Sequence, residues 1–197
     1  MWIIAGPNGA GKSTFTRHGV IREVSGQTLV ELNADERAQQ ILAAQPKIPD
    51  AALRAARDTD ARVALCITRG EDFLIETVLS TDKYIDDAER AVSLGFQIGM
   101  IYVGLATAQD AMRRVALRVA QQGHDVPADR IVSRWARSVA MLGRFIPLCE
   151  RLYVFDNSRP ATEGDPVLIA YKDEGGRVVL VERGRIPVID DVLLPFT

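Results

Sequence analysis

The segment 3–15, IIAGPNGAGKSTF, constrains the fold more than any other part of this chain. Residues 6–13 match the pattern G-x-x-x-x-G-K-S/T, in which a glycine-rich turn joins a buried strand to a helix. Gly6, Gly9 and Gly11 allow positive φ angles and let the backbone come close to phosphate oxygens. Successive N–H groups at the start of the helix then form a nest for anions. The segment predicts a nucleoside triphosphate site, but it leaves open whether the γ-phosphate goes to water, serves a protein switch, or is transferred to another molecule.

Two residues of this loop have separate expected roles. Lys12 is expected to reach the β- and γ-phosphates, and the hydroxyl of Ser13 to ligate Mg²⁺. The absence of the guanine-reading signature N-K-x-D favours ATP only weakly, so GTP stays open. The residues expected to bind the nucleotide are Gly6, Pro7, Asn8, Gly9, Ala10, Gly11, Lys12, Ser13 and Thr14.

Short apolar runs alternate with segments of helical period along the chain. This alternation predicts a three-layer α/β fold with a mostly parallel, five-stranded sheet, built as a single domain over 1–197. After Pro160, two apolar segments flank a Lys-Asp-Glu-Gly-Gly turn and predict a C-terminal antiparallel hairpin at about 160–197. Strands are expected at 2–5, 29–32, 72–76, 96–105 and 151–158, and helices at 12–24, 33–45, 50–70, 82–95, 107–121 and 128–145.

The composition excludes several classes of protein. The chain is 47% hydrophobic and 25% charged, as globular domains are, and its net charge of −2 offers no basic surface for nucleic acid or an anionic membrane. No uncharged run approaches the roughly 18 residues of a membrane helix. Because the first predicted strand starts at Trp2, we expect no signal peptide and a cytoplasmic location. Cys66 and Cys149 lie in apolar stretches without metal-ligand spacing and are expected to be buried, reduced thiols.

Carboxylates follow two of the predicted strands, at the edge where open parallel sheets bind ligands. Asp35 follows the second strand, where it can accept a proton from an attacking hydroxyl or, like Asn33, cap the next helix. Glu76 ends the third strand and can hold Mg²⁺ or its water, grip a substrate hydroxyl, or be solvated. Thr77 adds a hydroxyl group to the same loop.

The segment 111–138 carries arginines on both sides of a Gly-His-Asp-Val-Pro turn. Arg114 and Arg118 share a helix face, and Arg134 lies beyond the turn. Many small-molecule kinases build a mobile lid from such a helix–turn–helix, whose arginines neutralise charge during transfer and exclude water. A solvated basic helix face explains the same pattern. His124 in the turn is expected to make a local hydrogen bond or touch a ligand, not to bind metal; Arg113, Arg130 and Arg137 are expected at the surface.

Together these motifs resemble those of the zeta-toxin family of P-loop kinases. The matching segments span about residues 3–158 in the family's order: GPNGAGKST, NADE, IETVLS, RVALRVAQQGHDVPADRIVSRW and VFDNS. The block with Gly-His-x-x-Pro between arginines is the most specific of them. The resemblance implies a P-loop kinase-like fold with a helical lid at about 111–138.

The resemblance also implies an activity, the transfer of the γ-phosphoryl group from ATP to a sugar hydroxyl. Characterised members phosphorylate UDP-N-acetylglucosamine and are toxins held by an antitoxin, so a nucleotide sugar and an antitoxin protein are the expected acceptor and partner. By position, Asp35 would be the base, and Arg118 and Arg134 the lid arginines, with Arg114 as the alternative to Arg118. The expected acceptor-binding residues are Glu76, Thr77, Asn33 and His124.

Two other functions stay open at this point. A kinase for a different acceptor, such as an antibiotic, nucleoside or small polyol, would have the same fold. A nucleotide-dependent regulator or ATPase would use the triphosphate as a switch, but such a protein does not need a lid that carries arginines.

Overall fold

The computed structural model describes residues 1–17, 22, 26, 29–121 and 125–197 of the chain. Within these residues one sheet contains seven strands, in the spatial order β2-β3-β1-β4-β5-β6-β7: β1 (Trp2–Ala5), β2 (Val30–Asn33), β3 (Phe73–Thr77), β4 (Gly99–Gly104), β5 (Arg151–Asp156), β6 (Val167–Lys172) and β7 (Val178–Leu180). β1 to β5 pair in parallel, whereas β6 is antiparallel to both β5 and β7. The parallel sheet with an antiparallel hairpin at its edge confirms the fold expected from the sequence.

The α-helices lie between these strands in an order typical of α/β proteins. Their bounds are α1 (Lys12–Arg17), α3 (Ala34–Ala44), α4 (Ala51–Arg69), α5 (Lys83–Ser93), α6 (Ala108–Ala120), α7 (Ala128–Phe145) and α8 (Pro187–Leu193). Short 3₁₀ helices cover Ile146–Leu148, Ala161–Glu163 and Leu194–Phe196. Of the predicted first helix at 12–24, residues 18–21, 23 and 24 lie outside the described part of the chain.

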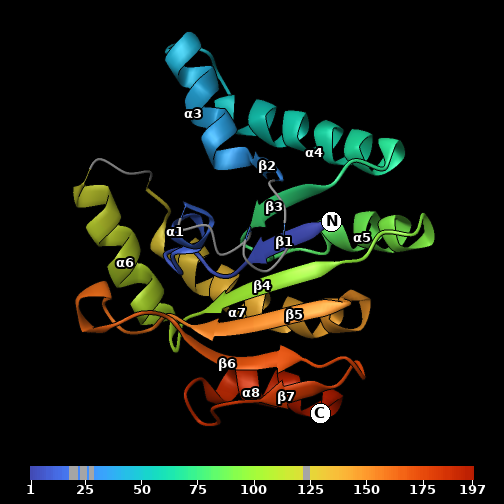
Figure 1. Ribbon diagram of the computed structural model, residues 1–197. Helices are drawn as coiled ribbons and strands as arrows, with labels where there is room; N and C mark the ends of the chain where they lie inside the picture. The colour runs from blue at the N-terminus through green and yellow to red at the C-terminus, as the bar shows by residue number, and fades with distance from the viewer. Residues whose placement is uncertain (18–21, 23–25, 27–28, 122–124) are drawn as a thin grey trace.

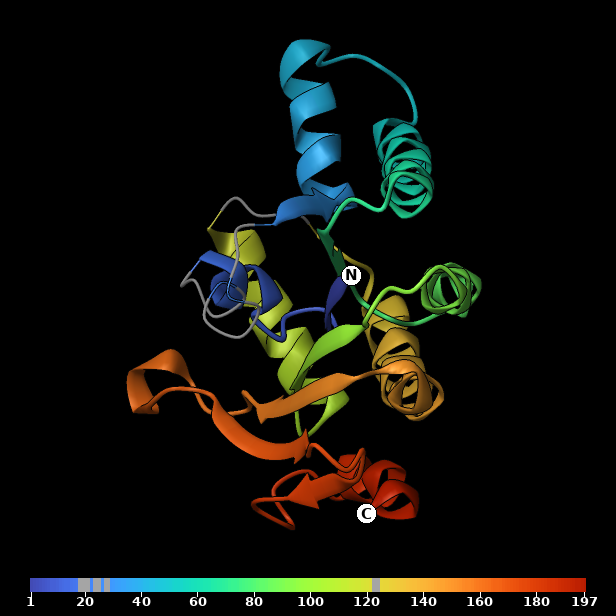
Figure 2. The same cartoon turned by 45° about the vertical axis from the view of Figure 1, so that its right-hand side comes forward.

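Helices cover both faces of the sheet and give it three layers (Figures 1 and 2). On one face, α5, α7 and α8 pack over a core that includes Met100 and Leu142, both fully buried. On the other face, α1 and α6 contribute Phe15 and Val115 to a second cluster. Every residue of the central strand β4 is buried, because helices shield it from water on both sides.

The arrowheads of β1, β3, β4 and β5 point toward the side of the molecule where α1 and α6 lie (Figure 1). The carboxyl ends of the parallel strands therefore meet beside the turn between β1 and α1. The strand register places Glu76 of β3 opposite Asn33 of β2 and Ile4 of β1. This edge of the sheet is where an open α/β fold binds its ligands.

Helices α3 and α4 stand together beyond the β2 edge of the sheet (Figure 1). No residue of α3 is buried, whereas α4 buries one face that includes Ala55 and Val63. The guanidinium of Arg37 on α3 donates to Asp58 of α4 at 2.9 and 3.1 Å. The first turn of α3 lies at the carboxyl end of β2, so this pair of helices flanks the ligand-binding edge.

The C-terminal segment differs from the expectation of a hairpin over 160–197. The hairpin covers only β6 and β7, and the chain then forms α8, which the sequence reading missed. Ile186, Ile189 and Leu193 are fully buried at a helical spacing of three and four residues, and Pro187 occupies the first turn. Helix α8 packs on β4 where Gly104 leaves room, since a Cβ there would lie 2.6 Å from Ile189 Cδ1.

Two expectations about composition can be compared with this fold. Cys66 and Cys149 are both buried and free, as predicted. Burial raises the pKa of both thiols, that of Cys149 to about 12. Among the described residues, no helix is both long and apolar enough to cross a membrane.

Candidate active site

The turn between β1 and α1 has the geometry of a phosphate-binding loop. Gly6, Gly9 and Gly11 all have positive φ angles, of 145°, 76° and 89°, as the sequence predicts. Lys12 is buried, and its ammonium group donates to the carbonyl oxygens of Gly6 at 2.9 Å and Pro7 at 3.2 Å. The loop thus surrounds a positive charge, and the N-terminus of α1 adds to the attraction for an anion.

A carboxylate from the neighbouring strand contacts this loop. The Ser13 hydroxyl lies 2.9 and 3.0 Å from the two carboxylate oxygens of Glu76 at the end of β3. Asn33 at the end of β2 donates its amide to the same carboxylate at 3.0 Å. Two segments that are distant in the sequence, the start of α1 and the end of β2, therefore meet at Glu76.

The electrostatics of this cluster favour a bound cation. Burial raises the pKa of Glu76, and the positive charge of Lys12 only partly opposes this effect. Burial likewise lowers the pKa of Lys12, against the charges of Glu76 and Asp35. The half-buried Glu76 carboxylate is thus incompletely compensated by its protein neighbours, and a further positive charge beside it would be stabilised.

The donors present here fit Mg²⁺. A hydroxyl and a carboxylate at hydrogen-bond distance are oxygen ligands, which this ion prefers, and it commonly takes its other ligands from phosphates and water. Among the described residues, no group of three or more His, Cys, Asp or Glu side chains could hold a metal ion by itself. Ser13, the residue predicted to ligate metal, and Glu76 are the two groups that would hold the ion.

The end of β2 and the start of α3 position the second carboxylate. The Asn33 side chain caps α3, since its carbonyl oxygen accepts from the backbone N–H of Asp35 at 2.9 Å and of Glu36 at 3.3 Å. Of the two capping candidates in the sequence, Asn33 is therefore the cap. The Asp35 side chain remains exposed in the first turn, near enough for its charge to affect the pKa of Glu76 and Lys12.

The loop after β3 has an unusual backbone. Leu79 has a φ of 55°, which is uncommon for a leucine, and its side chain is only 2% exposed. The Thr77 hydroxyl accepts from the Leu79 backbone N–H at 3.1 Å and stabilises the turn. Thr77, predicted to contact the acceptor, thus shapes the loop that follows Glu76.

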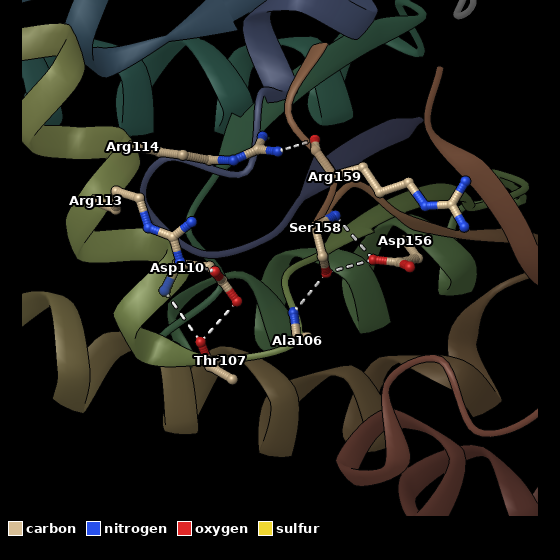
Figure 3. Close-up of polar contacts among 8 residues, drawn as sticks. All are labelled: Ala106, Thr107, Asp110, Arg113, Arg114, Asp156, Ser158 and Arg159. Carbon is tan, nitrogen blue, oxygen red and sulfur yellow. Dashed lines mark hydrogen bonds and ion pairs between the residues drawn. The ribbon is translucent and has the colours of Figure 1, made fainter. Parts of the chain in front are cut away.

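Helix α6 packs directly against the phosphate loop. A Cβ at Gly9 would lie 3.0 Å from the backbone oxygen of Ala111 and 3.1 Å from Cβ of Arg114, so only glycine permits this approach. Arg114 donates to the backbone oxygen of Arg159 (Figure 3), and burial lowers the pKa of its guanidinium group. Arg118, one turn further along α6, is exposed, and its charge acts on Lys12. The structure thus gives the two lid candidates different surroundings.

The second arm of the predicted lid is the N-terminal half of α7, which packs on α6. Arg134 is half-buried there, next to Trp135, whose indole N–H donates to the backbone oxygen of Leu105 at 3.0 Å. His124 lies outside the described residues, so its predicted role stays a prediction. The three arginines expected at the surface are exposed: Arg113, Arg130 and Arg137.

The segment that follows β5 reaches the site in a way that the sequence did not indicate. The motif VFDNS leaves open whether Asp156 or Asn157 lies near a nucleotide base or in a simple turn after the strand. Asp156 is only 5% exposed and accepts from Arg185 Nε at 2.9 Å. Asn157 donates to the backbone oxygen of Ala10 in the phosphate loop at 2.7 Å. Figure 3 shows Asp156 contacting Ser158, which in turn contacts Ala106.

The chain has an α/β fold like that of the P-loop kinases. No protein-family profile and no curated protein sequence matches the chain. Solved structures do share its fold. One is the AvrRxo1-ORF1:AvrRxo1-ORF2 complex, with a TM-score of 0.71 over 98% of this chain at 13% sequence identity. This chain covers 62% of the length of that matched chain.

Two further structures share this fold. One comes from the PezAT chromosomal toxin–antitoxin system of Streptococcus pneumoniae, with a TM-score of 0.60, 19% identity, and coverage of 100% of this chain and 77% of that one. The other is a putative kinase from Chloroflexus aurantiacus, with a TM-score of 0.51, 17% identity, and coverage of 68% and 74% respectively. A separate structure of the AvrRxo1 complex was solved with ATP. At these identities the likeness shows the fold alone.

Proposed function

We propose that this chain is an ATP- and Mg²⁺-dependent phosphotransferase of zeta-toxin type, which moves the γ-phosphoryl group to a hydroxyl group of a small molecule. The observation that carries the proposal is the contact of Ser13 with Glu76, at 2.9 and 3.0 Å. This contact brings a half-buried carboxylate to the phosphate loop, at the strand edge that also bears Asp35. A kinase needs a phosphate-binding loop together with acidic residues that bind Mg²⁺ and accept the proton of the acceptor hydroxyl.

The loop binds the triphosphate through its backbone and Lys12. The ammonium group now donates to two loop carbonyl oxygens, and in the complex it donates to the β- and γ-phosphate oxygens instead. Because Lys12 is already held inside the loop, little side-chain entropy is lost when it makes these bonds. When bound, Mg²⁺ supplies charge neutralisation at the phosphates, and Ser13 and Glu76 are the residues that would hold it.

Asp35 acts as the general base in this proposal. Its exposed carboxylate in the first turn of α3 accepts the proton of the acceptor hydroxyl as that oxygen attacks the γ-phosphorus. The oxygen of ADP that carried the phosphoryl group leaves on the opposite side, so the hydroxyl must lie in line with it. Asn33 keeps both carboxylates in place, since it caps the helix of Asp35 and donates to Glu76.

The arginines of α6 and α7 complete the site. Arg118 and Arg134 contact the triphosphate when the lid closes, stabilise the charge that develops on the transferred group, and exclude water. Arg114 holds the loop after β5 through the Arg159 carbonyl, so we assign the phosphate contact to Arg118. Exclusion of water is what separates a kinase from an ATPase that uses the same loop.

The acceptor that we propose is a nucleotide sugar such as UDP-N-acetylglucosamine, and the proposed partner is an antitoxin protein. The support for both is the zeta-toxin resemblance of the sequence, together with the fold shared with a protein of a toxin–antitoxin system. A pocket for the acceptor would lie between Asp35, which follows β2, and Glu76 and Thr77, which end the neighbouring strand β3.

Incubation with ATP and Mg²⁺ in the presence of a nucleotide-sugar panel tests this function, with phosphorylated products identified by mass. The proposal expects one phosphate added to a nucleotide sugar. Phosphate transfer only to antibiotics, nucleosides or polyols in a second panel would refute the acceptor class. ATP hydrolysis without any phosphorylated acceptor would refute the kinase assignment and favour a nucleotide-dependent switch.

A further inference from the structure

The peptide unit between Ala10 and Gly11 is held from outside the phosphate loop by Asn157. The Asn157 side-chain N–H donates to the Ala10 carbonyl oxygen at 2.7 Å. Gly11 lies so close that a Cβ there would be 2.7 Å from the same nitrogen, and its φ is 89°. One side chain from the end of β5 therefore contacts two consecutive residues of the loop.

This contact fixes the direction of a phosphate-binding group. In a planar trans peptide the carbonyl oxygen of one residue and the N–H of the next point in opposite directions. Because the Ala10 oxygen points at Asn157, the Gly11 N–H points away from it. Backbone N–H groups are what cradle the phosphates in loops of this pattern. The hydrogen bond outside the loop thus determines where a donor inside the loop is aimed.

Asn157 is itself firmly held. Its backbone N–H donates to the Gly104 oxygen at 3.0 Å, which extends the pairing of β4 and β5. On one side, the buried Asp156 side chain accepts from Arg185 Nε at 2.9 Å. On the other side, the Ser158 hydroxyl accepts from the Ala106 backbone N–H at 2.8 Å, as drawn in Figure 3. Because Asn157 and both of its neighbours are hydrogen-bonded to the protein, Asn157 is better suited to orient the loop than to adjust to a ligand.

We propose that Asn157 is a positioning residue for triphosphate binding, which sets the orientation of the Gly11 N–H, and that it does not read the nucleotide base. One N–H of its side-chain amide donates to the Ala10 carbonyl oxygen at 2.7 Å, which fixes the side chain against the backbone of the loop. The inference rests on the proposed nucleotide site, but not on the identity of any acceptor. It also gives the ion pair of Arg185 with the buried Asp156 a role in the site, because that pair holds the strand end from which Asn157 projects.

Two variants test the proposal by calorimetric titration in the presence of Mg²⁺ with ATP, GTP and inorganic tripolyphosphate, which has no base. Asn157→Asp replaces the donor by an oxygen that repels the Ala10 carbonyl, and Asn157→Ala removes it without repulsion. The Kd for ATP should rise about two- to tenfold in Asn157→Ala, the value of one hydrogen bond, and further in Asn157→Asp. The Kd for tripolyphosphate should rise by the same factor, and the ratio of ATP to GTP affinity should not change. Arg113→Ala, which alters an exposed ion pair on α6, is the matched control, and its affinities should equal those of the wild type.

The outcomes separate this inference from the proposed function. If the variants bind ATP more weakly but bind tripolyphosphate as the wild type does, Asn157 contacts the base and the positioning role is overturned. A changed ratio of ATP to GTP affinity would have the same meaning. Unchanged affinities in a folded Asn157→Ala variant would also overturn it, as would a wild-type protein that binds no triphosphate. If the expected pattern appears but no acceptor is ever phosphorylated, the inference stands and the kinase assignment fails.

Discussion

The Ser13 hydroxyl lies at hydrogen-bond distance from both carboxylate oxygens of Glu76, at 2.9 and 3.0 Å, and so links the first helix to the end of β3. Ser13 is the residue of the phosphate loop expected to ligate Mg²⁺, and Glu76 is a half-buried carboxylate whose pKa is raised by burial. A carboxylate that destabilises the unliganded protein when it is charged, but that can bind a cation in the complex, is typical of a functional site.

Glu76→Gln should stabilise the unliganded protein at neutral pH and abolish Mg²⁺-dependent transfer. Because the folded-state pKa of Glu76 lies above its unfolded value, its favourable contribution is complete below the unfolded pKa and is lost as the pH rises through the folded pKa. Glutamine can keep one hydrogen bond to Ser13 and one to Asn33 without a charge. The free energy of unfolding, from urea titrations between about pH 4 and pH 7, should fall less with pH in the variant than in the wild type. An identical pH dependence in the two proteins would contradict the burial argument.

Lys12→Ala should weaken ATP binding itself. The buried ammonium group is held within reach of any phosphate in the loop, and loss of a charged hydrogen bond should raise the Kd about 10- to 100-fold. Equilibrium binding of ATP, measured without an acceptor, gives the result directly. Arg130→Ala removes an exposed positive charge from the start of α7 and should leave the Kd unchanged. Full retention of ATP binding in the lysine variant would refute the assignment of the loop.

Asp35→Ala should keep ATP binding and lose phosphoryl transfer. The side chain is exposed, and Asn33 caps α3 through the backbone N–H groups of Asp35 and Glu36, which the substitution keeps. Loss of a general base should lower kcat about 10²- to 10⁴-fold. Glu36→Ala removes a neighbouring exposed carboxylate and is the matched control. Wild-type turnover in Asp35→Ala would exclude Asp35 as the base.

Much of this architecture could be predicted because its causes are local. The phosphate loop follows from three glycines with positive φ. The N-cap of α3 at Asn33 and the C-cap of α4 at Gly70 depend only on residues close by in the sequence. The parallel strands follow from short apolar runs between helical segments. The contact of Ser13 with Glu76 also fits the expected convergence of strand ends, although only the structure supplies its distance and the shared Asn33 bond.

The features that could not be predicted depend on partners far away in the sequence. Nothing near Asn157 indicates that it contacts Ala10, or that Arg185 pairs with Asp156, because these bonds span 147 and 29 residues. Helix α8 was not expected, because the hairpin was predicted to extend to about residue 197. The second strand of the hairpin ends at Leu180, and the apolar residues after it belong to the helix. Its signal was present as the spacing of Ile186, Ile189 and Leu193 after a strand-like run.

Arg118→Ala should lower kcat for transfer by about 10²-fold or more, while it changes ATP binding less. The guanidinium lies one helical turn beyond Arg114 on the helix that Gly9 brings against the loop, and its charge acts on Lys12. Arg113→Ala, on the outer face of the same helix, controls for a general loss of positive charge. Steady-state kinetics with ATP and the acceptor that the wild type phosphorylates give kcat and the KM for ATP. A larger loss of kcat in Arg114→Ala than in Arg118→Ala would reverse the assignment of the two arginines.

Ile189→Ala should destabilise the whole domain, because α8 is part of the core and not an appendage. Ile189 is fully buried and lies over Gly104 of the central strand, so its truncation leaves a cavity at the sheet. Truncation of a buried isoleucine to alanine costs about 2–5 kcal/mol. At about 2–4 °C per kcal/mol for a domain of this size, thermal unfolding should shift down by roughly 4–20 °C in a single transition. Val188→Ala, at an exposed position of the same helix, should shift it little. A separate low-temperature transition in Ile189→Ala, with the main transition unchanged, would show instead that the C-terminal helix unfolds independently of the sheet.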